Sequence, residues 1–413
     1  MSIIKSGILV VFNGLLQRSI PIILSLLVSI YTGESAFAEF TFILVTANTI
    51  SAVCAMGIAP AILSSLSETY YKNRENLNKD VTHICIFILI FAGITYSISI
   101  FFQVFTSDIA FSKNIFTLSK LASGILLIQA MQSVLYASKK YLIVTYFSIF
   151  QFFSSLVICY FILISNTPEN ISYVYSTIVI TIGISALIYG FIISSNKNFN
   201  NFSNFNISIF NQILKKQLPY TGYTLIWMVA VYGCTLIVAK KYSVLDLAIY
   251  NLGYQWYSLV LIIPALLSGI LIPHFVKNMN GSSNNNDITK ITIIYTVIAC
   301  ILMAILFISS SLIIKLYKFE PTELNQNVFL VMTAAGCLIA ISTPIMQKLL
   351  ADRSFKKLYC ISGIWTIIGL ICNWYFSNSV LEVSQWFLAA SSAVFVFAFI
   401  LLLNDLRNKK VSI

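Results

Sequence analysis

The sequence predicts an all-helical integral membrane protein, with twelve transmembrane helices in two six-helix bundles around a central cavity. Three observations lead to this prediction. Of the 413 residues, 58% are hydrophobic and only 9% are charged, whereas a soluble domain carries about 25% charged residues. Long apolar runs recur along the whole chain, and positive residues gather at alternate breaks between them. This composition excludes a soluble globular enzyme.

A membrane helix needs about 20 apolar residues to cross a hydrocarbon core about 30 Å thick. In chain order, the runs that meet this length cover residues 7–31, 36–60, 82–104, 116–138, 142–164, 172–194, 218–239, 247–273, 291–314, 327–349, 358–377 and 383–404. The first run is too long for a signal peptide, and no small-residue cleavage pattern follows it. We therefore expect the first run to be a permanent membrane helix.

The positive residues predict the orientation of the chain. With the N-terminus in the cytoplasm, 18 of the 25 Lys and Arg residues fall at cytoplasmic breaks or tails, six fall on the other side, and Arg18 remains inside a helix. Cytoplasmic loops carry an excess of Lys and Arg. The bias therefore predicts an even number of helices with both termini in the cytoplasm, and it accounts for most of the net charge of +11.

The two halves of the chain follow the same pattern. A shift of 210 residues superimposes the second set of predicted helices on the first, with a slip of several residues only at the fifth helix. Such a match indicates a parallel internal repeat, although evenly spaced helices also align by chance. We expect an N-terminal bundle at 1–194, a cytoplasmic linker at 195–217 and a C-terminal bundle at 218–413. The linker is predicted to lie flat at the interface or to start the seventh helix early.

Arg18 lies at the centre of the first predicted helix. An arginine at this depth raises the free energy of membrane insertion by about 2.5–3.5 kcal/mol. At 100° per residue, small and polar residues share its face of the helix: Gly7, Gly14, Pro21, Ser25 and Ser29. We expect this face to line a wet cavity or a helix contact. Because a guanidinium binds phosphate bidentately, we interpret Arg18 as an anion-binding residue. The alternative is a structural arginine that caps carbonyls of a neighbouring helix.

Uncharged polar and aromatic residues mark four other helices as candidate saccharide contacts. Aromatic rings supply stacking faces, while amides and hydroxyls supply hydrogen bonds, and a sugar ring needs both. The residues that we predict to contact saccharide are Gln129, Gln132, Gln151, Trp227, Tyr254 and Gln255. Interhelical hydrogen bonds and an aromatic belt at the membrane interface are the alternatives.

Acidic and metal-binding residues are scarce in the predicted helices. Glu39, about one turn inside the second helix, is the nearest approach to the buried ion-coupling acid that pumps use. His83 and His274 fall at cytoplasmic helix ends, and the eight cysteines fall inside predicted helices, where we interpret them as packing residues. We therefore predict no catalytic residue, no metal, no cofactor and no nucleic-acid partner.

The chain resembles the O-antigen (polysaccharide repeat-unit) flippases of the multidrug/oligosaccharidyl-lipid/polysaccharide exporter superfamily. The likeness covers the whole chain and rests on the 6+6 helix pattern and the mid-helix Arg18. It also rests on the region of Gly57, which closes the second helix, and on the stretch from Ile262 to Pro273, which contains Pro264. The likeness rests, finally, on the start of the seventh predicted helix, where Lys215, Lys216, Leu218 and Pro219 precede Trp227.

This resemblance implies a transporter in lipopolysaccharide and O-antigen biosynthesis, with polysaccharide assembly proteins as partners. It would flip an undecaprenyl-diphosphate-linked repeat unit from the cytoplasmic to the periplasmic leaflet of the inner membrane by alternating access, with Arg18 on the diphosphate. The lack of a clear coupling acid departs from the family pattern. One alternative is a multidrug exporter of the same superfamily, which would need a carboxylate in its cavity to bind cationic drugs. Another is an O-antigen polymerase or ligase, against which the short exported breaks without histidine argue.

Overall fold

The structure is a computed structural model that describes residues 3–55, 62, 66, 77–105, 115–164, 170–195, 207–262, 264 and 285–410. These residues form helices and turns and contain no strand, which confirms the predicted all-α class. Eleven of their helices are long and apolar enough to cross a membrane. The remaining predicted helix, the eighth in chain order (247–273), corresponds to α9 (Val244–Val260), which has 17 residues. The remainder of that predicted run lies largely outside the described residues.

The chain forms two compact units. Unit 1 consists of Met1–Thr32 and Glu39–Thr221, and unit 2 consists of Gly33–Ala38 and Gly222–Ile413. The break between the first two segments falls inside α2, whose first turn belongs to unit 2 and whose remainder belongs to unit 1.

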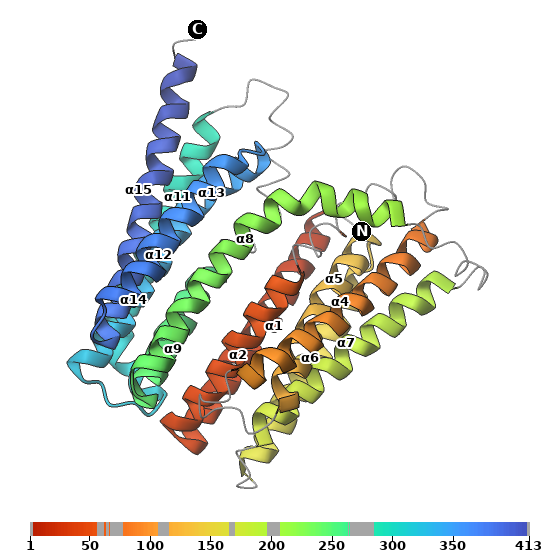
Figure 1. The fold of residues 1–413 in the computed structure, drawn as a ribbon, viewed down its shortest axis with the longest axis horizontal. Coiled ribbons are helices and arrows are strands. Elements are labelled where there is room, and N and C mark those ends of the chain that lie inside the picture. Colours follow the sequence, from red (N-terminus) through yellow and green to blue (C-terminus); the bar gives the residue numbers. More distant parts are fainter. Residues whose placement is uncertain are drawn as a thin grey trace. The chain divides into compact units, whose positions relative to one another are not determined.

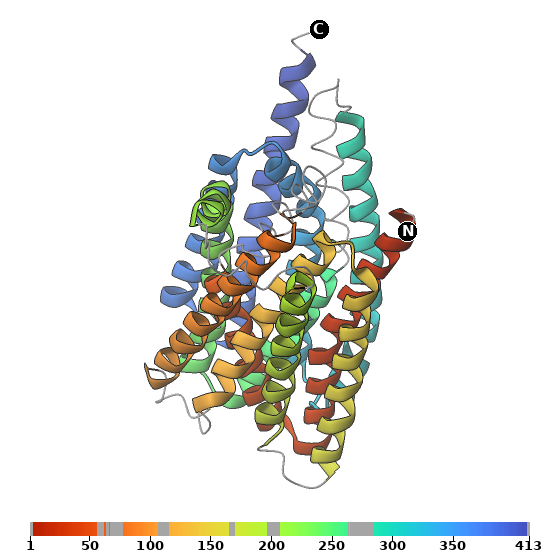
Figure 2. The same ribbon diagram turned by 90° about the vertical axis from the view of Figure 1, so that its right-hand side faces the viewer.

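In unit 1, α5 is the central helix, since it packs against α4, α6 and α7, while α1 runs alongside α6 (Figures 1 and 2). Small residues allow the closest contacts, between α5 and α7. The helices that contribute to this unit are α1 (Ile3–Thr32), α2 (Glu34–Ala55), α4 (Leu77–Phe105), α5 (Ile115–Ala137), α6 (Tyr141–Ile164), α7 (Ile171–Ser195) and the start of α8 (Ile207–Lys241).

In unit 2, α12 occupies the corresponding central place and packs against α9, α11, α13 and α15. The helices after α8 and α9 are α11 (Asn285–Leu316), α12 (Glu323–Ala351), α13 (Phe355–Thr366), the π-helix η3 (Ile367–Cys372), α14 (Asn373–Phe376) and α15 (Val380–Lys410). The eleventh predicted helix is therefore one continuous helical segment that consists of α13, η3 and α14. Its π-helical middle was not predicted.

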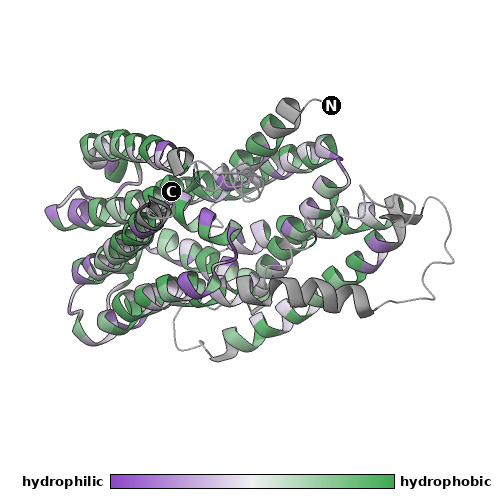
Figure 3. Ribbon diagram, turned by 90° about the horizontal axis from the view of Figure 1, so that it is seen from above, coloured by the Kyte–Doolittle hydropathy of each residue, from purple (hydrophilic) through white to green (hydrophobic). Residues whose placement is uncertain are grey.

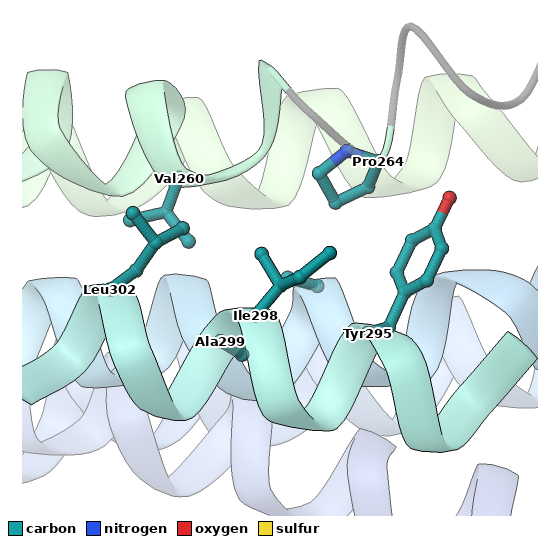
Figure 4. Close-up of a pocket in the computed structure, with 7 residues that line it drawn as sticks. Val260, Pro264, Tyr295, Ile298, Ala299 and Leu302 are labelled. Atoms are coloured by element: carbon teal, nitrogen blue, oxygen red, sulfur yellow. The ribbon is translucent and has the colours of Figure 1, made fainter.

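The exposed surface of each unit is apolar, as expected for a helix bundle that contacts lipid. Hydrophobic residues predominate along the helices (Figure 3). Many large ones are exposed, such as Leu89 and Ile94 on α4 or Ile301 and Ile308 on α11. In water such a surface would drive aggregation, so the exposed apolar residues agree with a multi-pass membrane protein.

One sequence alternative is favoured and one expectation needs correction. Residues 207–217 of the predicted linker are part of α8, which begins at Ile207 and continues to Lys241, in agreement with an early start of the seventh helix; residues 196–206 lie outside the described part. All eight cysteines are free, but Cys300 and Cys360 are exposed and Cys372 is half-buried. Cys300 and Cys360 therefore lie on exposed helix faces, and the packing role predicted for all eight cysteines does not hold for these two.

Candidate substrate-binding site

Arg18 is accessible on a face of α1 that is otherwise partly closed. Ser25 and Ser29, which share this face, are fully buried, whereas Arg18 is exposed at the middle of the helix. Within the described part of the chain, Arg18 has no ion-pair partner. A guanidinium that is accessible, unneutralised and at mid-helix can take a phosphate or diphosphate as its counter-ion.

Two amide side chains set the rotation of α1 about its own axis. Asn13 Nδ2 donates to the Tyr136 hydroxyl of α5 at 3.3 Å, and Gln17 Nε2 donates to Ser148 Oγ of α6 at 3.3 Å. Because Gln17 immediately precedes Arg18, its bond to α6 fixes the direction in which the guanidinium leaves the helix. Sequence reasoning missed both amides, although their spacing of four residues on the Arg18 helix was a signal for a shared face.

Helix α5 carries a polar strip on an otherwise buried surface. From Leu121 to Ala137 nearly every residue is buried, and the exceptions recur at steps of three or four residues: Ile125, Gln129, Gln132, Ser133 and Tyr136. Gln129 is exposed and the other four are half-buried. Since α5 is the central helix of unit 1, an accessible polar strip along it indicates a wet surface. The structure thus places Gln129 and Gln132 where a ligand can reach them.

The polar strip leads to a basic turn between α5 and α6. Tyr136 stacks on Tyr141 across this turn, with ring centroids 5.7 Å apart. Lys139 is exposed and adopts a positive φ of 56°, and the Lys140 ammonium lies 6.0 Å from the centroid of the Tyr189 ring. Burial lowers the pKa of Lys140, because desolvation disfavours its charged form. This end of unit 1 therefore offers cations next to the polar strip.

Gln151 occupies a different environment from the other predicted saccharide contacts. It is 6% exposed and lies on the same buried face of α6 as Ser148 and Ser155. Helix α6 packs against α1, and Ser148 contacts α1 through Gln17. The structure thus places Gln151 in the packed interior, where its Oε1 has no hydrogen-bond partner among the described residues, and we do not include it in the candidate site.

In unit 2, the predicted aromatic contacts are half-buried and rest on buried rings. Trp227 of α8 packs on Trp365, with centroids 5.4 Å apart and an interplanar angle of 42°. Tyr254 of α9 stacks on Tyr257 at 5.6 Å and 21°. Gln255 is half-buried beside Tyr254. Trp227 and Tyr254 therefore each leave part of their ring accessible, while the rest of the ring packs on a buried aromatic side chain.

Glu39 lies in the second turn of α2, where it is half-buried and is the first residue of the second segment of unit 1. Glu39 already makes an interaction within the protein, and its role in ion coupling stays a prediction. Among the described residues, no cluster of three or more His, Cys, Asp or Glu side chains is arranged to hold a metal ion. His274 and Gly57 lie outside the described residues, and the side chains of Lys215 and Pro219 are likewise not described.

Several solved structures share the fold. An inward-facing multidrug resistance MATE family transporter of the MOP superfamily matches with a TM-score of 0.79 and 11% identity, over 98% of this chain and 100% of that chain. MATE in the straight conformation matches with a TM-score of 0.68 and 11% identity, over 98% and 96%. The lipid II flippase MurJ, in an inward closed conformation, matches with a TM-score of 0.67 and 17% identity, over 96% and 87%.

No protein-family model and no curated protein matches the sequence. At 11–17% identity the similarity to solved structures establishes the fold alone. The chain therefore shares its fold with these MATE structures and with the MurJ flippase, and the proteins named here are transporters.

Proposed function

We propose that this chain is a flippase that moves an undecaprenyl-diphosphate-linked saccharide repeat unit from the cytoplasmic to the periplasmic leaflet of the inner membrane. The observation that carries the proposal is Arg18, an accessible guanidinium at mid-helix with no ion-pair partner in the described part of the chain. Among the described residues no carboxylate neutralises this charge, and a diphosphate is an anion whose geometry suits a guanidinium.

Accessible polar and aromatic side chains in each unit support a polar, uncharged cargo. In unit 1, Gln129 and Gln132 offer amide donors and acceptors along the α5 strip. In unit 2, Trp227 and Tyr254 offer aromatic faces. Amides and rings together suit the hydroxyls and the C–H faces of saccharides. The fold supports transport, and MurJ is named a lipid II flippase, which makes a lipid-linked substrate compatible with this fold. O-antigen repeat units are the cargo that we propose, with polysaccharide assembly proteins as partners.

Replacement of Arg18 by Ala tests the proposal. We expect R18A to insert normally and to lose surface O-antigen, because a charge-assisted hydrogen bond contributes about 1.5–3 kcal/mol. The matched control is Lys120→Ala, which removes another cation from a helix of unit 1. The Lys120 ammonium is already engaged 4.0 Å from the centroid of the Tyr173 ring, so K120A should still export. Full surface polysaccharide in R18A would contradict the proposed role of Arg18.

A multidrug exporter is the second candidate, because the MATE structures include the match with a TM-score of 0.79. A cationic drug would pair with a carboxylate, and Glu39 is the candidate in unit 1. Under this alternative, Glu39→Gln would sensitise cells to cationic dyes and R18A would not. Under the flippase proposal, R18A abolishes glycan export and dye resistance is unchanged in both variants.

A further inference from the structure

The two half-buried rings of unit 2 are the ends of one continuous aromatic network. Trp227 contacts Trp365, and Trp365 meets Phe387 edge-on with centroids 5.0 Å apart. Phe387 in turn meets Tyr257 edge-on at 5.1 Å, and Tyr257 stacks on Tyr254. The three inner rings are 0–3% exposed. A shift of any inner ring must therefore be transmitted to Trp227, to Tyr254 or to both, because packed interiors do not deform locally.

Gly369 fixes the position of the Trp365 ring. A Cβ added at Gly369 would lie 2.9 Å from Cζ3 and 3.0 Å from Cε3 of that ring. Only a glycine at position 369 therefore allows the Trp365 ring to lie this close to the backbone. Gly369 belongs to the π-helix Ile367–Cys372, a rare form that is frequently found at functional sites. The Cys234 thiol of α8 donates to the Gly369 carbonyl at 2.8 Å, which ties the π-helix to the helix that carries Trp227.

The indole of Trp365 is costly at this position. The residue is fully buried, and in the part of the chain that the structure describes its Nε1–H has no hydrogen-bond partner. A buried donor without a partner costs about 1–3 kcal/mol, and a phenylalanine would fill most of the same space without that cost. Stability alone therefore does not account for a tryptophan here.

We propose that Trp365, seated on Gly369 of the π-helix, is the positioning residue of a saccharide-stacking platform whose two open ends are Trp227 and Tyr254. This inference rests on the proposed function and makes it more specific. The platform recognises the apolar C–H faces of sugar rings, independently of the diphosphate that Arg18 holds. Trp365 acts on substrate through Trp227 and through the inner rings, and it need not touch the substrate itself.

Binding of two probes to the full chain in lipid nanodiscs separates these roles. One probe is undecaprenyl diphosphate, and the other is the pool of undecaprenyl-diphosphate-linked glycans extracted from membranes of the native cell. We expect Gly369→Ala to weaken glycan-lipid binding about twofold to twelvefold, the range of one aromatic contact, and to leave binding of the bare diphosphate unchanged. The matched control is Gly363→Ala in α13, where an added Cβ meets no atom within 4 Å; it should change neither affinity.

Trp365→Phe keeps the test decisive if Gly369→Ala folds poorly. This variant removes the unpaired N–H, so its melting temperature should stay equal or rise while glycan-lipid binding falls. A residue with only a structural role would not show this split. Wild-type affinity for glycan-lipid in both variants, or an equal loss for both probes, would overturn the inference. If the wild-type chain binds neither probe, the proposed function fails before the variants are compared.

Discussion

Gly124 of α5 and Ile180 of α7 bring two helix backbones into direct contact. A Cβ added at Gly124 would lie 2.8 Å from the backbone nitrogen of Ile180 and 2.9 Å from its Cα. Further along the same pair of helices, Gly183 faces Leu127 with a similarly short approach. Small residues allow this kind of close packing between membrane helices. The helix with the polar strip is thus held firmly from its buried side.

This contact predicts that Gly124→Ala is strongly destabilising. The added methyl group meets backbone atoms, which cannot rotate away, so we expect a loss of about 1–3 kcal/mol and a lower melting temperature in detergent. The control is Gly93→Ala in α4, where an added Cβ meets nothing within 4 Å. There the better helix propensity of alanine should add about 0.5–1 kcal/mol. Equal melting temperatures for the two variants would contradict the backbone contact.

Phe37 and Phe40 lie one turn apart in α2 but stabilise different units. Phe37 is fully buried and meets Tyr317 and Phe319 of unit 2 edge-on, at 5.6 and 5.5 Å. Phe40 is 3% exposed and packs on Tyr175 of unit 1 at 6.2 Å. The two side chains therefore form a matched pair for locating the boundary between the units.

We expect each Phe→Ala substitution to cost about 3–5 kcal/mol, but in different places. F37A should raise hydrogen exchange in the turn between α11 and α12, and F40A should raise it in α7 around Tyr175. Hydrogen exchange resolved by mass spectrometry measures both regions in one experiment. An increase in α7 with F37A, and none at the α11–α12 turn, would show that the first turn of α2 belongs with unit 1 instead.

The geometry of Arg18 predicts that lysine is a poor substitute. Arginine can bind a diphosphate through two parallel hydrogen bonds, whereas lysine acts as a point charge on a flexible stem. Arg18→Lys should therefore flip substrate at a rate between the rates of wild type and R18A. Most of the loss should appear as weaker substrate affinity. A transport assay in proteoliposomes at several substrate concentrations measures this. Wild-type affinity in R18K would mean that charge alone is sufficient at this position.

Local signals in the sequence were enough to locate the helices and to place Arg18 at mid-helix. Hydropathy over about 20 residues reports a membrane helix whatever surrounds it, and one charge at mid-helix stands out without knowledge of the packing. The predicted internal repeat has a counterpart in one pair of turns. The turn after α5 and the turn after α12 share the same hydrogen bonds, with a basic residue of positive φ in each, Lys139 and Arg353.

Features that depend on packing between helices could not be predicted. Gln151 and Gln129 are both amides in apolar helices, but one is buried and the other is exposed because only the neighbours of each helix decide which face is covered. Likewise, the position of the Trp365 ring depends on a π-helix, which is hydrogen-bonded to α8 through the Cys234 thiol. Periodicity alone contains neither piece of information.

The orientation predicted from the positive residues is testable at the two ends of α12. Lys318 precedes this helix and Arg353 follows it, and both are exposed in turns. We place the Lys318 turn in the periplasm, because 18 of the 25 positive residues fall on the other side. In a chain with Cys300 and Cys360 replaced by serine, Lys318→Cys should react with a membrane-impermeant maleimide in spheroplasts. Arg353→Cys should react only after permeabilisation, and the reverse pattern would invert the proposed direction of transport.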